Sequence, residues 1–127
     1  MNVIVKESKI EGKGVFAARK FKKGETVLDW CDSPILTSDE IKKIPEENKK
    51  YIYYSKKNLI LVKPPARFVN HSCNPNTFIQ NFQGIAKRDI QKGEEITEDY
   101  SKENNPGFRM KCNCKSKNCK EIIKTDS

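Results

Sequence analysis

The chain has 127 residues, 35% of them hydrophobic and 33% charged, which is enough apolar material for one domain with one modest core. No apolar run approaches the roughly 20 residues of a membrane-spanning helix, and the first residues lack the apolar stretch and cleavage site of a signal peptide. The composition therefore predicts a soluble intracellular protein, nuclear if the organism is eukaryotic and otherwise cytoplasmic.

The chain is strongly basic, with 25 Lys and Arg against 17 Asp and Glu and a net charge of +8. A positive field attracts nucleic acid, chromatin and other acidic surfaces without reading their sequence. Abundant lysine also keeps small domains in solution. Charge alone leaves both interpretations open.

Short β-type segments dominate the chain. Six of them, bounded by Gly, Pro, Asn or Lys-Gly, cover residues 3–5, 15–17, 26–28, 59–62, 77–79 and 95–97. One helix is predicted over residues 38–44, with Ser38 as a possible N-cap and Pro45 after its end. These elements predict a mainly β fold.

The chain also contains an internal echo, because residues 17–27 recur in pattern as residues 86–96. Each copy carries an apolar residue, a Lys-Gly bend and a following strand. Glycine supplies the left-handed conformation that such a bend often needs. The echo predicts a compact body of several small, curled sheets.

Five cysteines are present, an odd number that fits four metal ligands and one remaining thiol. Cys112, Cys114 and Cys119 cluster near the end of the chain, whereas Cys73 follows an Asn-His pair. Four thiolates close a tetrahedral zinc site, and neighbouring lysines favour the thiolate form. Inert thiols in a basic tail, or a disulfide-linked tail, are the alternatives. Cys31 would be the remaining thiol.

Three further motifs are weak when taken singly. Gly12-Lys13-Gly14 lets the backbone approach a ligand, but it is also typical of a plain turn. Asn70-His71 contains the only histidine, which excludes a multi-histidine metal site. Tyr100, which follows Glu98-Asp99, could equally be a packing residue.

In chain order, these motifs resemble those of the SET-domain protein-lysine methyltransferases. The resemblance rests on Gly12–Ala17, on the run Arg67-Phe68-Val69-Asn70-His71-Ser72-Cys73-Asn74-Pro75-Asn76, on Gly93–Tyr100 and on the cysteine tail. It implies a mainly β SET fold of several small curled sheets with a knot-like C-terminal crossing. The expected organisation is a SET domain over residues 1–107 and a post-SET-like zinc-binding tail over residues 108–127.

The resemblance also implies the residues of the site. Zinc would be held by Cys73, Cys112, Cys114 and Cys119. S-adenosylmethionine would bind near Gly12, Lys13, Gly14, Asn70, His71 and Tyr100. Tyr100 would be the active-site tyrosine, and Tyr51 or Tyr54 would supply a second aromatic wall of the lysine channel.

The implied function is methyl transfer from S-adenosylmethionine to a lysine side-chain amine in a protein substrate, a histone or another basic protein. A catalytically silent SET-like module that binds chromatin or protein is one alternative. A basic zinc-knuckle protein that binds nucleic acid is another. Glu98 stands where the family often has an aromatic residue, so the number of methyl groups added stays open, as do the substrate and the oligomeric state.

Overall fold

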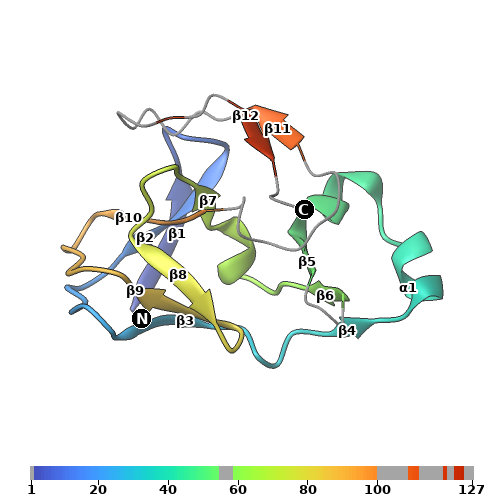
Figure 1. Ribbon diagram of the computed structural model, residues 1–127, viewed down its shortest axis with the longest axis horizontal. Coiled ribbons are helices and arrows are strands. Elements are labelled where there is room, and N and C mark those ends of the chain that lie inside the picture. The colour runs from blue at the N-terminus through green and yellow to red at the C-terminus, as the bar shows by residue number, and fades with distance from the viewer. Residues whose placement is uncertain (1, 55–58, 100–108, 112–118, 120–121, 125–127) are drawn as a thin grey trace.

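The protein is described here by a computed structural model that covers residues 2–54, 59–99, 109–111, 119 and 122–124 (Figure 1). A four-stranded sheet has the order β1 (Val3–Glu7), β2 (Lys13–Ala17), β10 (Glu95–Glu98) and β7 (Asn70–His71). One three-stranded sheet consists of β3 (Thr26–Asp29), β9 (Gln83–Ala86) and β8 (Thr77–Gln80). The other consists of β4 (Ile35–Leu36), β6 (Leu59–Leu61) and β5 (Ile52–Tyr54). The last is the pair β11 (Arg109–Lys111) and β12 (Ile122–Lys124).

Each of the six predicted β segments lies in a strand of these sheets, which confirms the mainly β class. The strands that the sequence did not predict are β4, β5, β7, β9, β11 and β12. Two of them, β4 and β7, have only two residues each, too few for any alternation of apolar and polar side chains to appear.

The predicted helix is present as α1 (Ser38–Lys42), followed by two short 3-10 helices, η1 (Glu46–Tyr51) and η2 (Ala66–Phe68). Its N-cap is Thr37, so the predicted Ser38 cap was wrong. Thr37 Oγ1 accepts a hydrogen bond from the Glu40 backbone at 3.2 Å, and Glu40 Oε1 accepts one from the Thr37 backbone at 3.1 Å. This capping box needs a Glu or Gln three positions after the cap, which Thr37 has in Glu40 and Ser38 lacks because Ile41 stands there. Within the described residues, no helix is long and apolar enough to cross a membrane.

The internal echo is a structural repeat. Phe21 and Ile90 exchange two backbone hydrogen bonds of 2.8 Å, and the bonds around them are reciprocal: Gly24 donates to Ala86 at 2.9 Å and Gly93 donates to Ala17 at 2.8 Å. Both glycines have φ near +90°, which confirms the predicted role of the Lys-Gly bends. We call residues 18–25 and 87–94 the paired turns.

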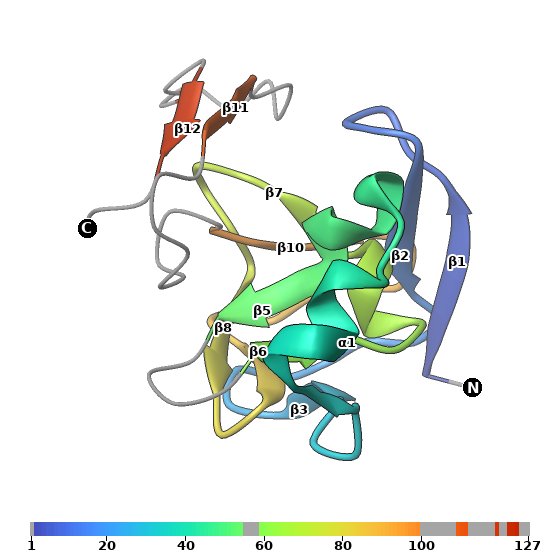
Figure 2. The ribbon, with the colours of Figure 1, turned by 90° about the vertical axis from the view of Figure 1, so that its right-hand side faces the viewer.

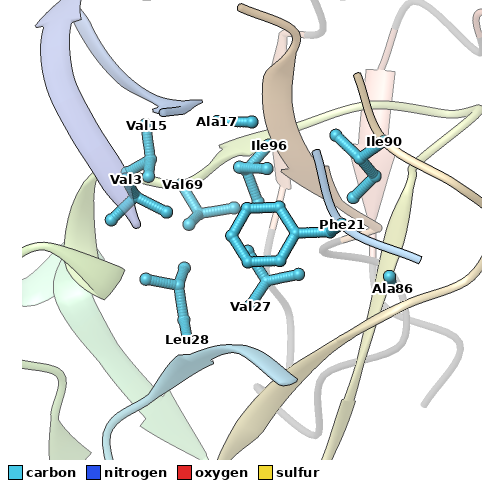
Figure 3. Close-up of a cluster of buried hydrophobic side chains, with 10 residues drawn as sticks. All are labelled: Val3, Val15, Ala17, Phe21, Val27, Leu28, Val69, Ala86, Ile90 and Ile96. Atoms are coloured by element: carbon cyan, nitrogen blue, oxygen red, sulfur yellow. The ribbon is translucent and has the colours of Figure 1, made fainter. Parts of the chain in front are cut away.

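The hydrophobic core joins the four-stranded sheet to the β3-β9-β8 sheet (Figure 3). Its buried members are Val3, Val15, Ala17, Phe21, Val27, Leu28, Val69, Ala86, Ile90 and Ile96. Val69 directly precedes β7, and Ile96 lies in β10. The burial of these two side chains fixes the positions of the polar residues that follow them.

Candidate cofactor and active site

The site is built where β7 lies parallel to β10. Asn70 is paired with Thr97 and His71 with Glu98, and the Ser72 backbone donates to Glu98 O at 3.0 Å. On its other edge, β10 pairs antiparallel with β2, which contains Lys13 and Gly14. One central strand therefore holds the Gly-Lys-Gly motif and the Asn-His motif in the same sheet (Figures 1 and 2).

The Asn70 side chain binds the loop before β2. Its amide nitrogen lies 3.0 Å from Glu11 O, 3.0 Å from Lys13 O and 2.9 Å from Glu95 Oε2. All three neighbours are acceptors, so the two amide hydrogens are shared among them. Asn70 is 8% exposed, which makes these bonds the means by which a buried amide is satisfied.

Glu95 is a residue of this site whose role the sequence analysis missed. Its carboxylate accepts hydrogen bonds from Ser8 Oγ, at 2.8 Å to each oxygen, and from Asn70. It thus connects β10 to Ser8, at the start of the segment between β1 and β2, and to Asn70 in β7. In the sequence Glu95 is one of several carboxylates before Tyr100, and nothing marks it as the one that turns inward.

The two glycines of the Gly12-Lys13-Gly14 motif serve different purposes. Gly14 is required for packing, because a Cβ there would collide with Glu95 Oε2 and lie 2.9 Å from Ser8 Cβ. Gly12 has φ +38°, where a side chain is strained, and no heavy atom lies within 4 Å of the place its Cβ would take. The backbone at Gly12 is therefore open to the approach of a ligand.

Asn76 and Thr97 form a second buried connection that the sequence did not reveal. The Thr97 backbone donates to Asn76 Oδ1 at 2.9 Å, while Asn76 Nδ2 donates to Glu95 O at 2.8 Å. Asn76 is 3% exposed and Thr97 is 7% exposed. The side chain of Asn76 thus forms hydrogen bonds with the backbone of β10 of the kind that a neighbouring strand would form.

His71 is buried between a thiol and a carboxylate. Its Nε2 lies 3.3 Å from Cys73 Sγ, and its Nδ1 lies 3.7 Å from Asp99 Oδ1. The ring therefore fixes the position of Cys73 relative to Asp99, the residue that directly follows β10. Its contacts orient neighbouring groups of the site.

Tyr51 is placed beside the Gly-Lys-Gly motif through an aromatic contact. Its ring meets the Phe68 ring edge-on at 5.9 Å, and Lys13 Nζ lies 5.8 Å from the Phe68 centroid. The Arg67 guanidinium lies 5.1 Å from the Tyr51 centroid. Tyr53 instead packs against Trp30 at 4.9 Å, and Tyr54 is described only as the last residue of β5.

The carboxylates before Tyr100 are mostly engaged with the protein itself. Partial burial raises the pKa of Glu94, but the Gln91 backbone N–H and the Arg88 guanidinium outweigh it, so this pKa lies below its ordinary value of 4.5. Glu95 faces Asn70, and Asp99 faces His71.

Some predicted site residues lie outside the described part of the chain, namely Tyr100, Cys112 and Cys114. Cys73 is buried and Cys119 is half-buried. Among the described residues there is no group of three or more His, Cys, Asp or Glu side chains that could hold a metal. The zinc ligands and the roles of the individual site residues stay predictions.

The strands β11 and β12 flank the cysteine segment. Their register pairs Lys111 with Ile122, so the residues on either side of 112–121 are held together. In both ribbon views this pair lies above β7, the strand that precedes Cys73 (Figures 1 and 2). The described ends of the tail are thus on the same side of the molecule as β7.

Comparison with known proteins gives consistent matches. The model of the SET domain matches residues 12–101. Human histone-lysine N-methyltransferase 2D is 32% identical over 94% of this chain, and the trr histone-lysine N-methyltransferase of Drosophila melanogaster is 30% identical over 94%. A Debaryomyces hansenii histone-lysine N-methyltransferase, named as specific for H3 lysine-36, is 30% identical over 93%.

These relatives are much longer proteins. The aligned region is 2% of the human protein, 6% of the Drosophila protein and 18% of the Debaryomyces protein. A crystal structure of a Plasmodium falciparum protein, named as a histone methyltransferase, superposes with a TM-score of 0.63 at 25% identity. It covers 78% of this chain and 92% of that one.

The match to the SET model extends from the Gly-Lys-Gly motif through the Asn-His motif to the end of β10, the segments that the four-stranded sheet brings together. A zinc knuckle alone does not account for such a match. The chain belongs to the SET-domain family.

Proposed function

We propose that this chain transfers a methyl group from S-adenosylmethionine to the side-chain amine of lysine in a histone or another basic protein. The observation that carries the proposal is the pairing of Asn70-His71 with Thr97-Glu98 beside the Gly12–Gly14 backbone, within a SET domain. Relatives named as histone-lysine N-methyltransferases support the reaction and the substrate class. SET methyltransferases use S-adenosylmethionine.

The residues present fit such a donor. The open backbone at Gly12 and the neighbouring β7–β10 pair would form the binding surface. The proposed contacts are Gly14, Lys13, Asn70, His71 and Tyr100. When bound, S-adenosylmethionine would supply an electrophilic methyl group on its sulfonium. Asn70 would act by holding the loop over the site, since its amide is already bonded to that loop.

The acceptor lysine must lose its proton before it can attack, because an ordinary lysine with a pKa of about 10.4 is almost fully charged at neutral pH. An aromatic wall disfavours the charged amine by desolvation. We assign this wall to Tyr51 and Tyr100. Tyr51 is preferred to Tyr54 because its ring packs on Phe68, next to Lys13. Alignment of amine and donor would then supply much of the acceleration.

The proposed organisation has a SET domain over 1–107 and a zinc-binding tail over 108–127. Cys73, Cys112, Cys114 and Cys119 form a donor set that suits tetrahedral zinc. The ion would have a structural role, keeping the tail against the Asn-His strand. The knot-like crossing of the Asn70 and Tyr100 segments, chromatin association and an intracellular location belong to the same proposal.

The test is transfer of label from radiolabelled S-adenosylmethionine to core histones and to a cell extract. We expect label in a protein lysine, and a loss of at least tenfold in Tyr100→Phe. Tyr53→Phe is the matched control, because Tyr53 packs on Trp30 and Phe82, whereas Tyr51 packs on Phe68. Binding of S-adenosylmethionine without transfer to any protein would favour a silent binding module. Absence of both in zinc-replete protein would overturn the proposal.

A further inference from the structure

The paired turns carry five exposed lysines: Lys20, Lys22, Lys23, Lys87 and Lys92. We call these residues the lysine patch. They come from two segments that are far apart in the sequence and that the fold places together at one edge of the molecule, away from α1 (Figure 1). The fold therefore brings five of the chain's 25 basic residues together on this edge.

Backbone contacts set the layout of the lysine patch. Phe21 and Ile90 form an antiparallel bridge, whose Cα atoms lie within about 5.5 Å in such pairs. Lys20 and Lys22 flank the bridge on one chain segment, and Lys92 follows two residues after it on the other. The Lys23 backbone donates to Asp89 Oδ1 at 2.8 Å, and Gly24 donates to the carbonyl that precedes Lys87.

The acidic residues of the paired turns already have ion-pair or hydrogen-bond partners. Glu25 pairs with Arg19 at 3.2 Å, and Glu94 pairs with Arg88 at 3.1 Å. Asp89 Oδ1 accepts a hydrogen bond from the Lys23 backbone N–H. Within the part of the chain that the structure describes, none of the five lysines forms an ion pair. Their charges are available to an external anion.

The side chains of the paired turns favour one class of anionic partner over the others. Phe21 and Ile90 have no exposed surface, and Arg19 lies over the Phe21 ring at 4.2 Å. The turns thus offer no aromatic face on which single-stranded bases could stack and no apolar anchor for a peptide. Lysine ammonium groups are compact point charges that contact phosphates without reading bases.

We propose that the lysine patch binds the phosphate backbone of duplex DNA, without sequence preference. The proposal adds a DNA contact on a surface built from the paired turns, distinct from the β7–β10 site. It does not depend on methyl transfer. It would bring the domain to substrates that are bound to DNA.

The experiment measures the affinity of the full chain for a fluorescent 20-base-pair duplex by anisotropy, over a series of KCl concentrations. The patch variant changes Lys22, Lys23, Lys87 and Lys92 to Gln. The control variant changes Lys6, Lys9, Lys42 and Lys43 to Gln, which are also exposed. Both variants lower the net charge by four from +8, so a general charge effect moves them equally. Thermal unfolding confirms that each is folded.

We expect wild-type affinity to fall steeply with salt. The patch variant should lose at least tenfold in affinity at low salt, and the slope of log K against log[KCl] should shrink by up to about 3.6, or 0.9 per lost phosphate contact. The control should stay within about threefold of wild type. Equal losses in the two variants would overturn the proposal. Binding that does not depend on salt would also overturn it. The same holds if single-stranded DNA or poly-glutamate of equal charge competes more strongly than duplex DNA.

Discussion

Asn70 donates a hydrogen bond to Glu95 Oε2 at 2.9 Å, and this contact joins the two strands that define the candidate site. Asn70 belongs to β7 and Glu95 to β10, yet the same amide also reaches the backbone at Glu11 and Lys13. A single part-buried pair therefore couples the central strand to the loop before β2. Disturbing it should affect stability and cofactor binding together.

Glu95→Ala should lower the free energy of unfolding by about 1–3 kcal/mol, because Asn70 and Ser8 lose the acceptor they share. It should also weaken S-adenosylmethionine binding, since the loop at Gly12 is released from β10. Urea unfolding and calorimetric titration measure the two effects. Glu47→Ala, at an exposed position in η1, is the control. Unchanged cofactor affinity in Glu95→Ala would show that the contact serves stability only.

Gly14→Ala should destabilise the protein by about 1–3 kcal/mol, because the added Cβ has to displace the Glu95 carboxylate and Ser8. Gly84→Ala is the matched control in another strand. There the Cβ would lie 3.6 Å from Leu28 Cβ, an ordinary contact, and φ is not positive. We expect Gly84→Ala to be nearly neutral in the same unfolding assay. Equal effects at both glycines would mean that the crowding at Gly14 relaxes without cost.

Purified protein should contain about one zinc ion per chain, measured by plasma emission. Cys73→Ser and Cys119→Ser should lose the metal, and chelation of wild-type protein should weaken S-adenosylmethionine binding. Cys31→Ser should keep it. Cys31 is exposed, and the adjacent Asp29 carboxylate raises the pKa of its thiol, which disfavours the thiolate. Full zinc content in Cys73→Ser would remove Cys73 from the ligand set.

The protein should lose stability in acid, because two carboxylates of the paired turns, Glu25 and Glu94, become protonated. The Lys22 backbone N–H and the Arg19 guanidinium hold the pKa of Glu25 below its ordinary value of 4.5, and the pKa of Glu94 is lowered as well. The unfolded chain then binds more protons than the folded one, so stability rises with pH in this range. The contribution is complete above about pH 5 and is lost as the pH falls through the lowered values.

Urea unfolding at pH 3, 4, 5 and 6 tests this acid dependence. The double variant Glu25→Gln/Glu94→Gln should be less stable than wild type at pH 6, and the difference should narrow towards pH 3. Glu7→Gln/Glu47→Gln, which removes the same charge from exposed positions outside the paired turns, is the control variant. A constant difference at all four pH values would contradict the assignment to ionised carboxylates.

Thr37→Ala should cost about 1 kcal/mol of helix stability, the usual loss for a removed N-cap. Ser38→Ala should cost less, because Ser38 is already inside α1. Hydrogen exchange at the Ile41 amide, which bonds to Thr37 O at 3.1 Å, reports on the first turn directly. Faster exchange in Ser38→Ala than in Thr37→Ala would restore the cap predicted from the sequence.

The local sequence pattern was sufficient to predict much of the fold. Strand-like runs such as those in β2 and β10 were recognisable because β-branched residues lie between glycine bends. The repeat of residues 17–27 at 86–96 predicted the two Lys-Gly bends, whereas the pairing of the two turns was seen only in the structure. By contrast, β7 consists of Asn70 and His71, which carry no strand propensity of their own. It is a strand because β10 offers it a partner.

Sequence by itself determined the family, the motifs and the candidate cysteine set, since these depend on residue identity and spacing. Only the tertiary structure decided that Glu95 binds Asn70 and that Tyr51 packs on Phe68, next to Lys13. It also decided that lysines about seventy residues apart form one patch. The physical reason is that these relationships are long-range. A carboxylate among others, or a lysine among 25 basic residues, acquires its role from neighbours that the fold supplies.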